Sequence, residues 1–181
     1  MAISRESERK SMPRSSRSNG ISDTRVVSAR MRGGSPSFSG SPSPGALHAK
    51  VEGLITVRSS FGHDETLVRF EAAVRANGLR IVTGVDHAIA ACEAGVSLDA
   101  TTVLMVGDGR RQAGLIKALR SIALELPFKV LVWQDAGETW LSYIDFRWLA
   151  KRYGAGPEEL CLITDIAVMI DGIARKTASP P

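Results

Sequence analysis

The chain has 181 residues, of which 44% are apolar and 6% aromatic, with two cysteines and a formal net charge of +4. This composition excludes collagen-like, disulfide-stapled and wholly disordered chains, and the length suits one medium-sized domain with a tail. The charge is unevenly distributed: residues 1–50 hold nine Lys+Arg and three Asp+Glu, whereas residues 51–181 hold fourteen and sixteen. The first segment is therefore basic, and the remainder gives no electrostatic case for binding nucleic acid.

Residues 1–50 contain thirteen serines and end in a run rich in Gly, Ser and Pro. Such a segment cannot bury enough apolar surface to offset the ordering of its backbone, which costs about 1–2 kcal/mol per residue. We therefore predict a disordered basic tail over residues 1–50 and a single α+β domain over residues 51–181. A targeting segment, which an arginine- and serine-rich start also suggests, and an overextended start site are the alternatives.

The first half of the predicted domain alternates strands and helices. A strand is predicted over residues 54–58, and residues 62–64 (Gly-His-Asp) then signal a helix start because a short polar side chain can accept from the first amides. Residues 77–78 (Asn-Gly) supply the left-handed stop that a helix end favours. Residues 79–85 alternate as a strand does, and a short helix is expected over residues 88–94.

The second half begins with an apolar run over residues 101–106 that indicates a central strand. The turn at residues 107–109 opens a helix that Pro127 stops. Residues 128–133 and 139–144 then form a hairpin. The inner face of the helix is expected to consist of Leu115, Leu119, Ile122 and Leu126.

Two helices complete the chain, one capped by Asp145 and one opened by Pro157. The inward residues of the last helix are expected to be Leu160, Ile163, Ala167 and Ile170. With five strands and at least one hairpin, this order favours the α+β class, with a largely antiparallel five-stranded sheet and helices on one face. Two strand-helix-strand units leave a ferredoxin-like sandwich as the alternative fold.

Other sequence features limit the classes of site. Cys92 and Cys161 lie far apart without a C-x-x-C pair, so we expect buried free thiols in a reducing cytoplasm. No stretch approaches the roughly 18 apolar residues of a membrane span, so a soluble, cytoplasmic protein is expected. The three histidines form neither His-x-x-x-His nor Glu-x-x-His spacing, so the sequence predicts no metal site and no cofactor.

Several stretches between Ser59 and about Gly154 resemble a known family. They are Ser60-Phe61, Val85 to Ala88, Thr101 to Leu104 leading to Gly107, Leu124 to Trp133, and Ser142-Tyr143 before Asp145. In combination they resemble the domain-of-unknown-function family 302. The resemblance implies a compact α+β fold akin to that of the TATA-box-binding protein, often found as a homodimer, with no established activity.

The chain departs from this family pattern at two turns. After the central strand the family usually shows Gly-Asn-Pro and, two residues later, Gly-Thr; this chain has Gly-Asp-Gly at residues 107–109 and Gln-Ala at residues 112–113. The family's Asp-Pro after the tyrosine is Asp145-Phe146 here. If the first turn holds a ligand in the family, its lost hydroxyl and added carboxylate argue against the same ligand in this chain.

The turn at residues 107–109 also has features of a weak anion site, because it follows a strand and opens a helix beside Arg110 and Arg111. Gly109 and these two arginines are the candidate anion-binding residues. A dinucleotide fingerprint would need glycine in place of Gln112, and the ending of a P-loop is absent. The alternative interpretation is an exposed basic turn whose Asp108 caps the helix.

Asp86-His87 is the stronger candidate for a functional site. His87 continues the alternation of the second predicted strand, so the sequence predicts that its ring points to the covered face of the sheet. A buried imidazole needs a hydrogen-bond partner, and ligand contact or acid/base work is the functional alternative to a purely structural role.

Three functions remain open. The first is a homodimeric small-ligand-binding or accessory module, with a cleft formed by Asp86, His87, Asp108, Trp133 and Tyr143. The second is an enzyme that uses His87 as general acid or base. The third is binding of nucleic acid or an acidic partner by the tail. The first function is preferred. The aromatic residues on the hairpin strands are also candidates for a core or a dimer interface; these residues are Trp133, Trp140 and Tyr143.

Overall fold

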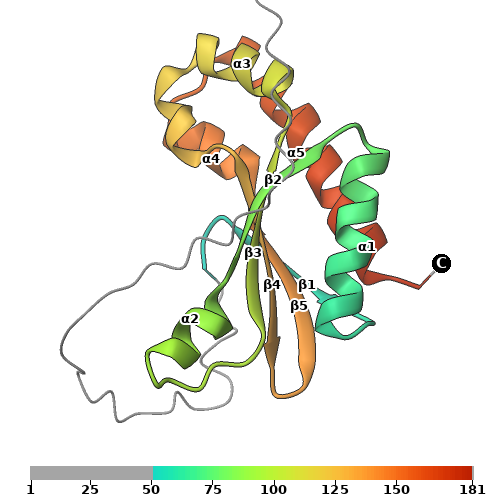
Figure 1. The fold of residues 1–181 in the computed structure, drawn as a ribbon. Coiled ribbons are helices and arrows are strands. Elements are labelled where there is room, and N and C mark those ends of the chain that lie inside the picture. The colour runs from blue at the N-terminus through green and yellow to red at the C-terminus, as the bar shows by residue number, and fades with distance from the viewer. Residues whose placement is uncertain (1–50, 181) are drawn as a thin grey trace, which may run out of the picture.

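The computed structural model describes residues 51–180, so the predicted tail over residues 1–50 lies outside the described residues. Five strands form one sheet in the order β1-β5-β4-β3-β2, and every neighbouring pair is antiparallel (Figure 1). The strands are β1 (Leu54–Ser59), β2 (Arg80–Asp86), β3 (Thr101–Gly107), β4 (Phe128–Asp135) and β5 (Glu138–Ile144). The predicted α+β class with a largely antiparallel five-stranded sheet is confirmed.

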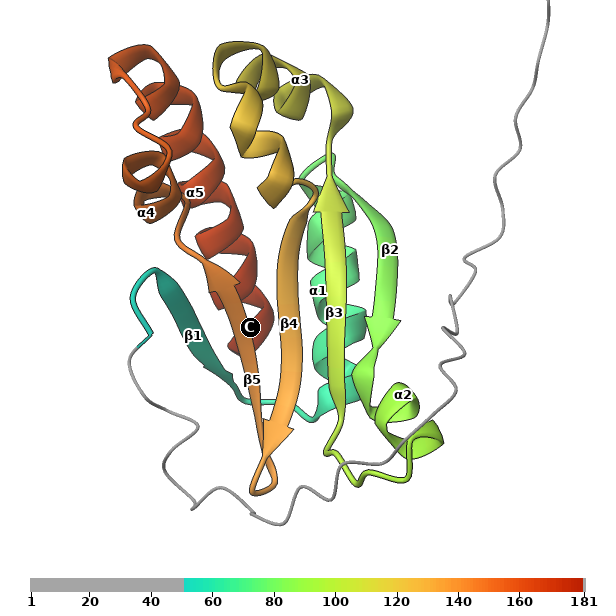
Figure 2. The same cartoon turned by 90° about the vertical axis from the view of Figure 1, so that its left-hand side faces the viewer.

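The helices are α1 (His63–Ala76), α2 (His87–Glu93), α3 (Gly109–Ala118), a 3-10 helix η2 (Arg120–Glu125), α4 (Phe146–Arg152) and α5 (Pro157–Ala178). The two longest, α1 and α5, lie side by side on one face of the sheet, as predicted (Figures 1 and 2). The short α2 instead stands on the opposite side of the sheet, at one end. We call this end, where the β4–β5 turn also lies, the hairpin end, and the other the α3 end.

The core lies between the sheet and the pair α1 and α5. Alternate residues of the three central strands point into it, including Leu104, Val130 and Leu141, which are all buried. Phe70 of α1 and Ile170 of α5 are completely buried against them. The buried residues of the helices and of the strands therefore form one apolar layer, as the packing of helices on a sheet requires.

The interior of β2 contains a bulge. Ile81 pairs with Val106 and Thr83 pairs with Met105, so Val82 is an extra residue without a partner of its own. Since side chains alternate with period two, one inserted residue transfers all later side chains to the other face. Thr83 and Val85 consequently lie on the face of the sheet opposite to that of Ile81.

The helix predicted to run to Pro127 is interrupted at Leu119, which has non-helical backbone angles. The chain continues as η2, and this break lets Leu115 and Ile122 both reach the core, where they are completely buried or nearly so. Leu119 and Leu126 are partly buried against the same core. The predicted inner face is thus correct, although one continuous helix is not.

Two sequence predictions about α5 and the cysteines are wrong. Leu160, in the first turn of α5, is exposed, while Ile163, Ala167 and Ile170 are buried as predicted. Cys92 and Cys161 are both exposed rather than buried. Cys92 lies on α2, which buries none of its residues, and Cys161 occupies the solvent side of α5.

No helix among the described residues is both long and apolar enough to cross a membrane.

Candidate functional site: the open face of the sheet

One face of the sheet is not covered by any helix of residues 51–180, and we call it the open face (Figure 2). Pairing between the strands places its side chains in three rows across the sheet. From the hairpin end toward the α3 end, the rows are Thr101, Trp133, Trp140 and Arg58; then Val85, Val103, Leu131, Ser142 and Thr56; then Thr83, Met105, Lys129, Ile144 and Leu54. Most of these residues are apolar, so the open face is a hydrophobic surface.

Ser142 fixes the aromatic part of this surface. Its hydroxyl oxygen accepts a hydrogen bond from Nε1 of Trp133 at 2.9 Å and lies 2.9 Å from Oγ1 of Thr56. The rings of Trp133 and Trp140 are 6.4 Å apart, tilted by 30°. Because Ser142 satisfies the indole and is itself buried, it orients Trp133 and leaves the apolar surface of the ring available for contact.

The helix α2 borders the open face at the hairpin end. Asp86 begins it, since Oδ1 of this residue accepts a hydrogen bond from the Ile89 amide at 3.0 Å. The helix consists mainly of apolar and small residues, yet none of them is buried. Ile89 and, beyond the helix, Val96 and Leu98 are exposed. A two-turn helix without a packed face is marginal in water.

The prediction that His87 points to the covered face is wrong. The ring is exposed at the first position of α2, and no described residue forms a hydrogen bond with it. The cause is the bulge at Val82, which inverts the alternation between Ile81 and Thr83. The sequence pattern of β2 cannot show this inversion, because Val82 looks like any other strand residue.

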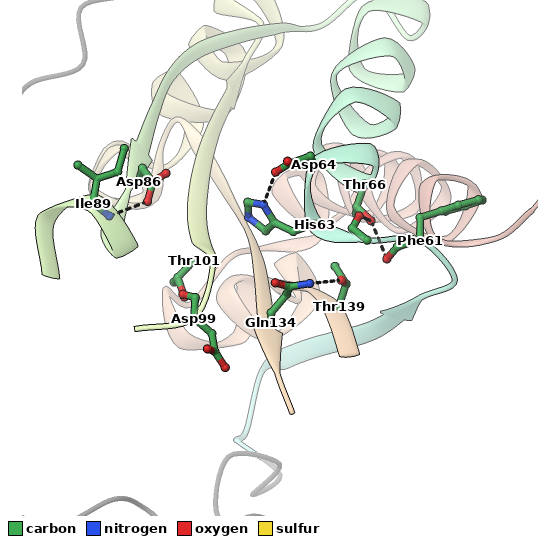
Figure 3. A network of polar contacts seen from close by, with 11 residues as sticks. Phe61, His63, Asp64, Thr66, Asp86, Ile89, Asp99, Thr101, Gln134 and Thr139 are labelled. Carbon is green, nitrogen blue, oxygen red and sulfur yellow. Dashed lines mark hydrogen bonds and ion pairs between the residues drawn. The ribbon is translucent and has the colours of Figure 1, made fainter. Parts of the chain in front are cut away.

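His63 is the histidine that the structure buries. Only 8% of this residue is exposed, and its ring lies between the start of α1 and the sheet (Figure 3). Nδ1 of His63 lies 3.1 Å from Oδ1 of Asp64, and Nε2 has no hydrogen-bond partner among the described residues. Its position could be found from the sequence, because His63, Thr66, Phe70 and Val74 recur at helical spacing and all four are buried.

Other buried polar groups gather at the hairpin end of the covered face. The hydroxyls of Ser59 and Thr66 are 2.8 Å apart, and Thr66 also donates to the carbonyl of Gly62 at 2.8 Å. Gln134 donates to Oγ1 of Thr139 at 3.4 Å (Figure 3). The bond between Ser59 and Thr66 fastens the start of α1 to β1, whereas the bond from Gln134 joins the two strands of the hairpin.

Tyr143 lies on the covered face, beneath α5. Its hydroxyl donates to Oδ1 of Asp171 at 2.6 Å, and Nε of Arg175 donates to the other oxygen of Asp171 at 2.8 Å. Burial, and then the hydrogen bond to Asp171, raise the pKa of Tyr143 well above its ordinary value. The hydrogen bond from Arg175 lowers the pKa of Asp171. The network joins β5 to α5 and has no contact with the open face.

Asp108 caps α3 at the opposite end of the sheet from Asp86. Its Oδ1 accepts from the Arg110 amide at 3.0 Å, so a carboxylate occupies the place where a bound anion would lie. Gly109 and Arg110 are exposed beside it. Binding of an anion by Gly109, Arg110 and Arg111 stays a prediction without support from this geometry.

The five residues predicted to share a cleft do not meet. Asp86 and His87 lie at the hairpin end, Asp108 at the α3 end, Trp133 on the open face, and Tyr143 on the covered face. None of them lines the cavity of about 460 Å³ beside the β1–α1 loop or that of about 360 Å³ along α5. The five residues thus form no common cleft. Only Trp133 belongs to the apolar surface of the open face.

Within residues 51–180, no group of three or more His, Cys, Asp or Glu side chains could hold a metal ion.

These features define an antiparallel α+β domain with one uncovered sheet face. The family described as "Domain of unknown function DUF302" matches residues 55–176, from β1 into the last turns of α5, and the chain belongs to this family. The resemblance that the sequence motifs indicated is thereby confirmed.

A solved structure shows the same fold. The crystal structure of an uncharacterized conserved protein DUF302 from Bacillus stearothermophilus is similar with a TM-score of 0.66 at 19% identity, covering 71% of this chain and 100% of that chain. At this level of identity the likeness concerns the fold alone.

Curated relatives are longer than the matched region. Over 128 residues the chain is 35% identical to "Fluoride-specific ion channel FluC 1" of Brucella suis biovar 1 (strain 1330), with 69% of this chain and 48% of that protein covered. The protein of the same name from Brucella abortus biovar 1 (strain 9-941) is also 35% identical, with 46% of it covered. The chain therefore spans about half the length of these relatives.

Proposed function

We propose that this chain is a non-catalytic accessory module that associates with a second copy of itself through the open face. The observation that carries the proposal is the uncovered apolar surface of the three rows, among them Leu131, Trp133 and Met105. A contiguous apolar surface rimmed by charged residues marks an interaction site, because its exposure to water is unfavourable. An isologous pair buries the same surface on both chains.

The geometry favours association over the two other classes of function. A small-ligand cleft from the five predicted residues lacks support, since they are scattered. An enzyme based on His87 lacks support as well, because no described residue forms a hydrogen bond with the ring that would orient it or share its proton. Binding by the basic tail concerns residues outside the described part of the chain.

Sedimentation equilibrium of the full chain tests the proposal. Leu131→Glu places a charge in the middle row and should convert a dimer into a monomer at equal concentration. Val68→Glu is the matched control: Val68 is 69% exposed on α1, away from the open face, and its substitution should leave the dimer intact. Circular dichroism checks the fold of both variants.

Val85→Glu is a milder second variant, because Val85 belongs to the same row but lies on the edge strand β2. A monomeric wild type, or a dimer that survives both open-face substitutions in folded protein, contradicts the proposal.

The curated relatives favour a second role for the same module. The described residues of this chain contain no helix that could cross a membrane, and the matched region covers about half of those proteins. We propose that the shared half is an accessory part of those proteins, separate from their pore. Removal of the matched half from the Brucella suis protein should leave fluoride efflux from reconstituted vesicles measurable, whereas complete loss of efflux by a folded, inserted protein contradicts this role.

A further inference from the structure

We propose that two copies of this chain pair with their strands antiparallel across the interface, so that α2 of each copy docks on the α3 end of the other's open face. This inference rests on the proposed dimer and specifies its arrangement. Three features of the structure lead to it: the position of α2, the charges at the two ends of the face, and the size of the surface.

Within residues 51–180, α2 borders β3 but buries none of its own residues there. It projects on the open-face side at the hairpin end, and none of its residues is buried (Figure 1). Ile89 is exposed although it is large and apolar. A second copy that covers α2 would supply the packing that a seven-residue helix lacks.

Exposed charges beside β2, β3 and β4 differ in sign between the two ends of the face. Exposed Glu93 and Asp99 lie with α2 at the hairpin end, and exposed Arg80 and Lys129 lie toward the α3 end. None of these four forms an ion pair within residues 51–180. The hairpin end also carries Arg58, but this residue is already paired with Glu138.

This polarity selects one of the two possible face-to-face arrangements. A two-fold axis across the strands brings the acidic end of each copy onto the basic end of the other, and places α2 near the partner's β2. An axis along the strands would instead bring like ends together and place α2 near the partner's β1. Opposite charges favour the first arrangement, because facing like charges oppose association.

The size of the surface agrees with a contribution from α2. Five strands spaced about 4.8 Å apart and about seven residues long form a flat face of roughly 550 Å². A standard interface buries about 800 Å² of accessible surface on each partner, and the side chains of α2 would add to the contact that the sheet provides. Each copy contributes one such two-turn helix, about 10 Å long.

Charge reversal tests the arrangement. Glu93→Arg and Arg80→Glu should each weaken the dimer about tenfold, since every pair occurs twice in a symmetric dimer. The double variant should recover most of the wild-type affinity in sedimentation equilibrium. The arrangement is overturned if the single reversals leave the dimer affinity unchanged. It is also overturned if the double variant loses as much affinity as the two single variants combined.

Disulfide trapping gives a geometric test with the native thiol of α2. In a Cys161→Ser background, Arg80→Cys should form a disulfide-linked dimer with Cys92 of the other copy on mild oxidation. Arg58→Cys in the same background should not. Trapping through position 58 overturns the arrangement while the proposed dimer stands; a dimer indifferent to Leu131→Glu contradicts the proposed function itself.

Discussion

At the residue scale, Tyr143 and Asp171 connect ionisation to stability. The folded pKa of Asp171 is lowered, chiefly by Arg175, so its carboxylate stabilises the fold above the unfolded pKa of about 3.9, and this contribution is lost as pH falls through the folded pKa. We expect Asp171→Asn to be less stable than wild type near neutral pH and nearly equal to it at strongly acidic pH. Urea unfolding at several pH values measures the difference.

Asp165→Asn is the control for this acid dependence, because Asp165 lies on the same helix without an ion pair to a described residue. It should keep the wild-type dependence on pH. A difference between wild type and Asp171→Asn that is constant from neutral to acidic pH would refute the assignment.

The raised pKa of Tyr143 has the opposite consequence. Its contribution is fully present below the unfolded pKa of about 10 and is lost as pH rises through the folded pKa. The pKa of Tyr153 is also raised, mainly by its hydrogen bond to Glu125. We expect the phenolate absorbance of both tyrosines to appear above their ordinary range, together with alkaline unfolding. Titration of Tyr143 near pH 10 in folded protein would argue against its burial beneath α5.

At the scale of elements, α2 is the helix whose stability should depend on protein concentration. It has an N-cap at Asp86 but no buried residue, so in a single chain its amides should exchange with solvent rapidly. Covering by a second copy should slow this exchange. Hydrogen exchange at low and high protein concentration should therefore show added protection in α2 but not in α1, which is packed on the sheet of its own chain.

An Asp86→Ala variant separates capping from association. Loss of the cap weakens an N-terminus by about 1 kcal/mol, so exchange in α2 should accelerate at low concentration and remain partly protected in the dimer. Exchange in α2 that is slow at every concentration would show that the helix is stable within one chain.

At the scale of the whole molecule, stability depends on the layer between the sheet and α1 with α5. Ile170 is completely buried there, so Ile170→Ala should cost about 2–5 kcal/mol of unfolding free energy. Val168, two residues away on the same helix, is 63% exposed, and Val168→Ala should change the free energy by less than about 0.5 kcal/mol. Urea denaturation measures both; similar effects at the two positions would contradict the orientation of α5.

The candidate site was predicted less well than the fold, and β2 shows why. The alternation of apolar residues defines a strand wherever it lies, but the extra residue at Val82 changes which face the later residues occupy. His87 was therefore assigned to the wrong side. The burial of His63 can be predicted from its helical spacing with Phe70 and Val74, because helix α1 contains no such irregularity.

The amino-acid sequence by itself determined the order and kind of the elements, because hydrophobic period, caps and turn residues act over neighbouring positions. It also determined membership of the family through motifs spread along the chain. Only the tertiary structure decided that Trp133 and Tyr143 lie on opposite faces of the sheet and that, within residues 51–180, α2 buries none of its residues and no helix covers the open face. These properties depend on strand register and on which surfaces remain after packing, and such relations join residues that are distant along the chain.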